Sequence, residues 1–153
     1  MIRKMSLFGM LAAVLTVLSS GAVAQGQAAF ARKSLQNMTS FAFYSKSGVF
    51  RVTKLGKVIE EKKDDDLQNG KLKFLILGPG QARIIGNNGA GKVTLHRTRS
   101  SVSFVERTVL GDQHIFTVEN QWDEKSGGYK ATYIRTVTFG DEVWRTVYVG
   151  HAK

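Results

Sequence analysis

Cysteine is absent from this sequence of 153 residues, and only one proline is present. Without cysteine sulfur the chain has no disulfide, no catalytic thiol and no zinc site built on cysteines. The length describes a single domain and excludes a multi-domain enzyme. Because a domain of this size buries roughly two thirds of the surface that its unfolded chain exposes, we expect its core to stabilise it without cross-links.

A hydrophobic run long enough to cross a membrane as a helix is also missing. An uncharged stretch, Leu7–Leu18, follows two basic residues, but as a helix it would rise only about 18 Å against a hydrocarbon layer of about 30 Å. The small residues Ala22 and Ala24 then precede a glutamine. We interpret residues 1–24 as a secretory signal peptide cleaved after Ala24.

Cleavage at that point predicts a periplasmic or extracellular protein. No cysteine follows the cleavage site, so the leader is not of the lipoprotein kind. We expect no insertion of the mature chain into a membrane, because strands that span one need about 9 to 11 residues with an apolar outer face. Several extended runs of this chain are shorter or basic.

Acidic residues are few, with 12 Asp and Glu against 22 Lys and Arg, a formal charge of +10. Without residues 1–24 the chain keeps 129 residues, of which 20 are basic and 12 acidic, a formal charge of +8. This excess favours anionic partners such as lipid headgroups, an acidic polysaccharide or an acidic protein face, although solubility alone is an alternative reason for it. We do not expect nucleic acid as a partner.

Helical periodicity is lacking after Thr39, where short runs of Val, Ile, Thr, Phe and Tyr alternate with a period near two. Glycine, asparagine, aspartate and serine separate the runs and supply the turns. The pattern predicts strands at Thr39–Ser45, Gly48–Leu55, Lys57–Lys62, Lys71–Leu77, Gln81–Ile85, Lys92–Arg97, Ser101–Leu110, Gln113–Asn120, Tyr129–Phe139 and Glu142–Gly150.

Connections this short join strands antiparallel, since a parallel crossover needs about a dozen residues. We therefore expect an all-β fold, an antiparallel meander of eight to ten strands over residues 39–153. A calycin-like or lipocalin-like barrel is favoured over a β-sandwich, because closure removes the exposed edges. Residues 25–38 form a lead-in segment that contains a short helix at most.

Two motifs resemble ligand loops but lack essential parts. Gly86–Lys92 reproduces the spacing of a phosphate-binding loop, but Val93 stands where the magnesium-binding hydroxyl belongs, and a strand follows instead of a helix. In the acidic stretch Asp64–Gly70, the register that suits a calcium loop leaves Leu67 and Ile76 at ligand positions. We expect turns at both places, with no metal site and no cofactor.

No catalytic constellation is present either. The histidines at 96, 114 and 151 have no local spacing that would place two on one metal, and each is expected at the surface or half buried. Glu106 and Glu119 lie on neighbouring strands, where acid–base work is one interpretation and pairing with arginines on the outer face the favoured one. We therefore expect no enzyme.

The arginines give the strongest functional signal. In the segment Tyr129–Phe139, Arg135 shares its side of the strand with tyrosines and apolar residues, while lysine and threonines occupy the other side. The alternation predicts that Arg135 points inward. The same placement is predicted less firmly for Arg97, Arg107 and Arg145, since the opposite sides of their strands also carry aromatic residues.

Inward arginines need carboxylates, water or an anionic ligand, because an unpaired buried charge is costly. We expect a basic cavity with Tyr129, Tyr133 and Trp144 in its walls, suited to an anionic small molecule or an amphiphile with a carboxylate or phosphate head. Bulges that carry the arginines to a solvated rim are the alternative. A second hypothesis is an interaction module, such as an inhibitor or an envelope-polymer-binding protein, that uses a basic outer face between Lys71 and Arg107.

Three sequence segments resemble parts of other proteins: Gly80–Gly89, Phe104–Thr108 and Arg145–Gly150. Together they span roughly the last half of the chain, and they resemble small uncharacterised secreted bacterial proteins. Each segment consists of turn and strand residues and contains no catalytic or ligand-binding motif. The resemblance implies a secreted β protein and assigns no activity, cofactor or site.

Overall fold

The computed structural model describes residues 34–65, 67, 72–85 and 92–153. Nearly all of them belong to one antiparallel sheet, so the prediction of an all-β meander is confirmed. Its nine strands are β1 (Ser40–Lys54), β2 (Lys57–Lys63), β3 (Leu72–Gly78), β4 (Gln81–Ile85), β5 (Lys92–Arg97), β6 (Ser101–Arg107), β7 (Gln113–Asp123), β8 (Gly128–Phe139) and β9 (Glu142–Ala152).

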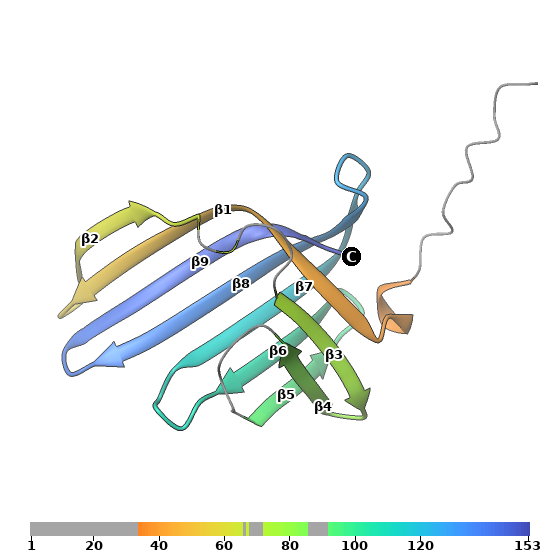
Figure 1. Cartoon of the computed structure of the whole chain (residues 1–153), viewed down its shortest axis with the longest axis horizontal. Coiled ribbons are helices and arrows are strands. Elements are labelled where there is room, and N and C mark those ends of the chain that lie inside the picture. The colour runs from red at the N-terminus through yellow and green to blue at the C-terminus, as the bar shows by residue number, and fades with distance from the viewer. Residues whose placement is uncertain (1–33, 66, 68–71, 86–91) are drawn as a thin grey trace, which may run out of the picture. The chain divides into compact units, whose positions relative to one another are not determined.

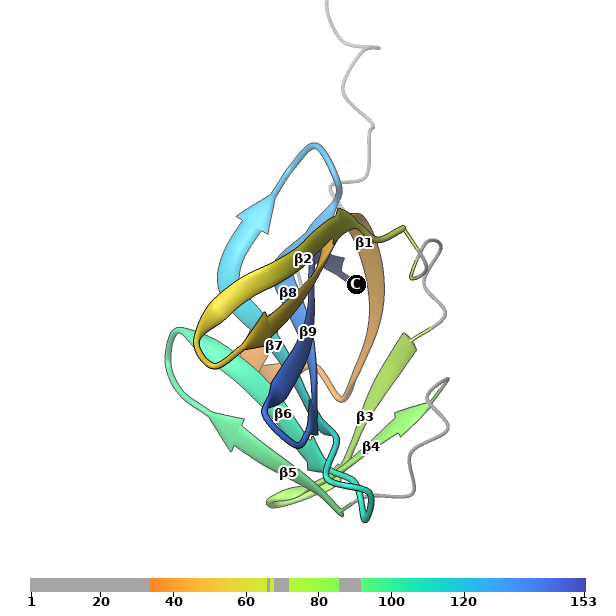
Figure 2. The ribbon, with the colours of Figure 1, turned by 90° about the vertical axis from the view of Figure 1, so that its left-hand side faces the viewer.

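The sheet closes on itself through β1, which pairs with β9 on one side and with β3 and β2 on the other. The barrel, predicted in preference to a sandwich, is therefore confirmed: eight strands close it, and β2 is an additional strand (Figures 1 and 2). The first part of β1 pairs with β3, and its second part pairs with β2. Strand β1 thus runs the full height of the barrel and belongs to both of its ends.

A β-bulge at Lys46 joins two segments that the sequence pattern predicts as separate strands. Ser45 pairs with Gly150 and Ser47 with Val149, so Lys46 is an extra residue in β1. Such a bulge reverses the alternation. Phe41 and Phe43 face the interior before it, and the buried residues after it fall at even positions.

The hairpin between β1 and β2 shows why the turns form where the sequence places them. Leu55 and Gly56 connect the two strands with φ angles of 47° and 79°. Two central residues with positive φ give the twist that matches a tight antiparallel hairpin. The remaining described residues with positive φ are all glycines, in the turns between other strands.

One end of the barrel, here called the base, is closed by the lead-in segment. The expected short helix is a single 3-10 turn, η1 (Leu35–Asn37), whose Leu35 is buried in the core. The side chain of Gln36 donates to the Thr98 carbonyl at 2.6 Å, which fixes η1 beside the turn between β5 and β6. In Figure 1, η1 lies at the opposite end from β2.

Aromatic rings fill the interior above this base. Phe74 and Phe116 stack with ring centroids 3.7 Å apart, and Phe104 lies within 6 Å of both. All three side chains are fully buried. Burying aromatic side chains of this size supplies a large share of the hydrophobic stabilisation.

Some sequence expectations fall outside the described residues. They are the signal peptide at 1–24 and most of the phosphate-loop resemblance, residues 86–91. Within the described ranges, no helix has the length and apolar character needed to span a membrane.

Candidate functional site

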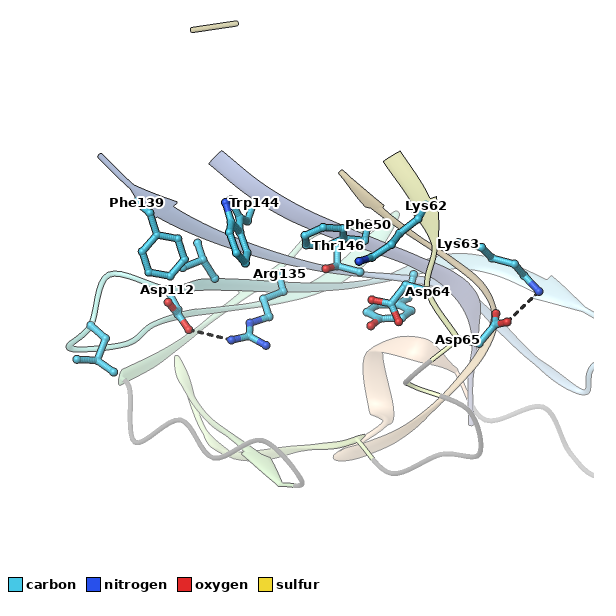
Figure 3. A pocket seen from close by; sticks show the side chains of 13 residues that line it. Phe50, Lys62, Lys63, Asp64, Asp65, Asp112, Arg135, Phe139, Trp144 and Thr146 are labelled. Atoms are coloured by element: carbon cyan, nitrogen blue, oxygen red, sulfur yellow. Dashed lines mark hydrogen bonds and ion pairs between the residues drawn. The ribbon is translucent and has the colours of Figure 1, made fainter. Parts of the chain in front are cut away.

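The barrel holds a cavity of about 790 Å³ at the end opposite the base, here called the mouth. Rings and aliphatic side chains form much of its wall, and charged groups gather on β2, beyond β2 and at Asp112 and Arg135 (Figure 3). The described lining residues are Phe50, Lys62, Lys63, Asp64, Asp65, Leu110, Asp112, Arg135, Val137, Phe139, Trp144, Thr146 and Tyr148. The cavity opens to solvent, since Phe139 and Trp144 remain 56% and 41% exposed.

Strand register arranges the interior in layers, and one layer is polar. Four inward residues on β6, β7, β8 and β9 pair successively across neighbouring strands. They are Glu106, His114, Arg135 and Thr146. Glu106, His114 and Thr146 are the buried polar or charged side chains of the part of the chain that the structure describes. The polar layer therefore concentrates the buried polar chemistry at the level of Arg135.

The layer below it is aromatic. Phe104, Phe116, Tyr133 and Tyr148 are neighbours on the same four strands. Tyr133 and Tyr148 stack with centroids 6.1 Å apart, and Tyr148 reaches the cavity wall. This aromatic layer forms the floor on which the polar layer lies.

A hydrogen bond ties the two layers together. The Tyr133 hydroxyl and Nδ1 of His114 are 2.6 Å apart, and both side chains are buried. Burial lowers the pKa of His114, a direction that Arg135 reinforces and the carboxylates of Glu106 and Asp112 oppose. Burial also raises the pKa of Tyr133. The imidazole is thus held neutral beside a neutral phenol.

Arg135 points into the mouth, as the alternation of β8 predicts. Its Nη2 lies 3.3 Å from Oδ2 of Asp112, and its side chain remains 54% exposed. Asp112 is its hydrogen-bond partner within the described residues, which leaves the other guanidinium donors unused. Arg135 is therefore both inward and solvated, between the two expectations drawn from the sequence.

Thr146 is a functional candidate that sequence reasoning missed. It is the cross-strand neighbour of Arg135, it lines the cavity, and it is 8% exposed. Its hydroxyl makes no hydrogen bond to any residue in the described ranges. The alternation of Thr146 and Tyr148 on β9 is the signal that identifies it.

Trp144 forms part of the cavity wall, as expected. Its ring packs edge-on against Phe139 and Phe50 at 5.2 and 5.9 Å between centroids, and its Nε1 donates to Glu142 at 3.2 Å. Lys62 extends over the Phe50 ring, with Nζ 4.9 Å from the centroid. These contacts hold an aromatic wall along one side of the mouth (Figure 3).

The inward placement of Arg145 and Arg107 is wrong. On β9 the buried positions are Thr146 and Tyr148, so Arg145 is exposed on the outer face. On β6 the buried positions are Phe104 and Glu106, which leaves Arg107 exposed as well. In both strands, valines occupy the outer face and gave the misleading alternation.

Arg97 shares its side of β5 with two core residues, but it lies at the base. Its guanidinium donates to the carbonyls of Gln36 and Met38 at 2.6 and 3.2 Å, so it helps to hold η1. Tyr129 is buried against Trp122, six residues and about 20 Å along β8 from Arg135. Of the predicted site residues, Arg135 and Trp144 meet in the cavity and Tyr133 lies beneath it.

The expected excess of positive charge is not found among the described residues of the lining. Three cations in the described lining, Lys62, Lys63 and Arg135, face three carboxylates, those of Asp64, Asp65 and Asp112. Lys63 pairs with Asp65 at 2.9 Å, and Lys62 pairs with Glu60 at 3.0 Å. The described part of the lining is charge-balanced, and Arg135 is distinguished there by guanidinium donors that no described residue uses.

Glu106 and His114 are buried in the interior. The sequence analysis favours the outer face for Glu106 and a surface or half-buried position for His114, so both are more deeply placed than expected. Val102 and Phe104 precede Glu106 on the same side of β6, and Phe116 and Val118 follow His114 on the same side of β7. That alternation could have located both. Within the described residues, no cluster of three metal-binding side chains is present.

Comparisons with protein-family models, with curated proteins and with solved structures find no match to this chain.

Proposed function

We propose that the protein is an exported, non-enzymatic binding protein that holds an anionic amphiphile in the mouth of its barrel. The observation that carries this proposal is the pair Arg135 and Thr146, neighbours on β8 and β9 that both face the cavity. Guanidinium donors that no described residue uses, and a Thr146 hydroxyl at the cavity wall without a hydrogen-bond partner in the described residues, suit a carboxylate or phosphate oxygen. The aromatic wall suits an apolar tail.

The dimensions agree with such a ligand. Small-molecule sites are typically concave, roughly 300 to 1,000 Å³ in volume, and mostly apolar with a few placed polar groups. The cavity in the mouth has a volume of about 790 Å³. The rings of Phe50, Phe139 and Trp144 form part of its wall, and Arg135 and Thr146 supply polar groups. A ligand would lie with its head on Arg135 and its tail along these rings.

Decanoate and 1-decanol test this directly, because they share a chain and differ in the charge of the head. We expect the purified chain to bind decanoate more tightly than decanol in a calorimetric titration. Arg135→Gln should weaken decanoate binding about tenfold or more, since a charge-assisted hydrogen bond is lost. Arg145→Gln removes the same charge from the outer face of the neighbouring strand and should leave the affinity unchanged.

Two results would overturn the proposal. One is the absence of decanoate binding by the unaltered chain together with no small ligand retained in native mass spectrometry of the purified protein. The other is equal weakening by Arg135→Gln and Arg145→Gln, which would show that net charge acts without the cavity.

The alternative of a basic outer face keeps some support. Lys73, Arg83 and Arg107 are exposed on the outer surfaces of β3, β4 and β6, whereas Lys71 lies outside the described residues. Retention on an anionic polymer that falls steeply with salt, without a cavity ligand, would favour that interaction module. Its partner would then be an anionic polymer or an acidic protein.

A further inference from the structure

The turn between β6 and β7 places a carboxylate of the chain itself at the proposed binding group. Asp112 immediately precedes β7, and its side chain is only 19% exposed. Figure 3 shows this carboxylate directed into the cavity toward Arg135. It lies where the head of an anionic ligand would form its ion pair.

The backbone around Asp112 is fixed independently of this ion pair. The amide of Thr108 donates to the Asp112 carbonyl at 2.9 Å, and the amide of Asp112 donates to the Thr108 hydroxyl at 3.0 Å. Gly111 donates to the Thr108 carbonyl at 3.1 Å. The carboxylate can therefore leave Arg135 by side-chain rotation while the turn keeps its shape.

The contact between Asp112 and Arg135 is replaceable. It uses one oxygen and one nitrogen at 3.3 Å, longer than the 2.7 to 2.9 Å typical of charge-assisted pairs. A ligand carboxylate can form two parallel hydrogen bonds with the same guanidinium. Two carboxylates on one guanidinium repel each other, so the ligand gains most when Asp112 moves away.

We propose that Asp112 is an internal competitor of the ligand: its carboxylate occupies Arg135 in the empty protein and limits the preference of the site for anionic over neutral heads. This inference rests on the proposed function of the mouth. A neutral head has no ion pair to form with Arg135 and does not need to displace Asp112. Asp112 thus lowers the affinity for anionic ligands selectively.

The test compares decanoate affinity in the unaltered chain, Asp112→Asn and Asp141→Asn. Asp141 is a matched control, because it is an acid in the β8–β9 turn whose ion pair is with Lys54 instead of Arg135. We expect Asp112→Asn to tighten decanoate binding about fivefold, the upper end for a partly exposed ion pair, and Asp141→Asn to change it by less than about twofold. Decanol affinity should be the same in all three.

A double variant shows whether the gain passes through Arg135. When Arg135→Gln is already present, adding Asp112→Asn should give no tightening, because no guanidinium remains to be released. Asp112→Ala, which also removes the amide acceptor, should tighten binding at least as much as Asp112→Asn. Thermal unfolding of each variant verifies that the barrel is intact.

The outcomes separate this inference from the proposed function. If the unaltered chain binds decanoate but both Asp112 variants bind with equal or lower affinity, Asp112 is not a competitor and the function stands. A gain that persists with Arg135→Gln also overturns the inference. If neither the unaltered chain nor any Asp112 variant binds decanoate, and native mass spectrometry finds no retained small ligand, the proposed function itself fails.

Discussion

The base and the mouth of the barrel belong to one sheet and serve opposite purposes. Near the base, Phe74, Phe104 and Phe116 are fully buried and stack on one another. At the mouth, inward positions of the same alternation carry Arg135 and Trp144, and a cavity remains between them. Alternation therefore decides which side of the wall a residue occupies, and the chemistry of each layer decides whether that layer is core or site.

The polar layer lies between these two regions. Glu106 and His114 are buried just above the rings of Phe104 and Phe116, their inward neighbours two residues along β6 and β7. Buried polar groups are expensive unless they are hydrogen-bonded. The polar layer therefore separates the packed aromatic core from the cavity of the mouth.

The largest expected contrast comes from removing one ring in each region. Phe116→Ala should lower the free energy of unfolding by about 3 to 5 kcal/mol, because it leaves a void within a ring cluster. Trp144→Ala, in the half-exposed wall, should lower it by no more than about 1 kcal/mol and should weaken decanoate binding. Urea unfolding measures both free energies, and equal losses would contradict the division into core and site.

A smaller effect is expected where the two regions meet on β1. A Cβ at Gly48 would collide with the Asp64 carbonyl oxygen and the Tyr148 ring. Gly48→Ala should therefore lower the free energy of unfolding by about 1 to 3 kcal/mol, as overpacking does. Gly78→Ala is the control, since nothing lies within 4 Å of its Cβ position. If chemical denaturation shows both variants to be as stable as the unaltered chain, the close approach is relaxed at no cost.

The smallest effect concerns pH and the polar layer. Burial holds the pKa of His114 below its ordinary value of 6.5, so as the pH falls the unfolded chain takes up a proton before the folded one. The stabilisation is complete above about pH 6.5 and is lost as the pH falls through the folded-state pKa. His151, whose pKa burial also lowers, acts in the same direction.

Urea unfolding between about pH 8 and about pH 5 should therefore show stability that decreases toward acid. His114→Gln should flatten this dependence, and the slope that remains is assigned to His151. Asp123 does not contribute in this range, because hydrogen bonds from Ser126 and Lys46 lower its pKa to about 2. An unchanged slope in His114→Gln would contradict a neutral, buried imidazole.

Much of the fold could be predicted from the sequence, because most strands alternate between apolar and polar residues and are bounded by turn residues. The predicted strand from Gln81 to Ile85 and that from Lys92 to Arg97 match β4 and β5. The turn predicted near Ser47 is wrong. The structure has a β-bulge there, and the chain continues as the single strand β1. A bulge and a turn use similar residues, so local sequence does not distinguish them.

The site was harder to predict than the fold. Arg135 could be placed because one side of β8 is clearly apolar, whereas valines on both sides of Arg107 and Arg145 made the outer face look like the inner one. The prediction for Glu106 favours the outer face, because cross-strand pairing with arginines is the common role of a strand carboxylate. The charge balance of the cavity depends on residues from β2, β8 and the β6–β7 turn, which only the closed barrel brings together.

The bulge at Lys46 has a consequence for how this chain can change. As one extra backbone unit, it keeps Phe43 and Phe50 on the same side of the wall although they are seven residues apart. Replacing Lys46 by another residue keeps the bulge, and with it the inward orientation of Phe43 and Phe50. Deleting one residue here would reverse the alternation in one half of β1. Either the phenylalanines near the base or Phe50 in the wall of the mouth would then face water. At this position β1 therefore tolerates a change of residue type but not a change of length.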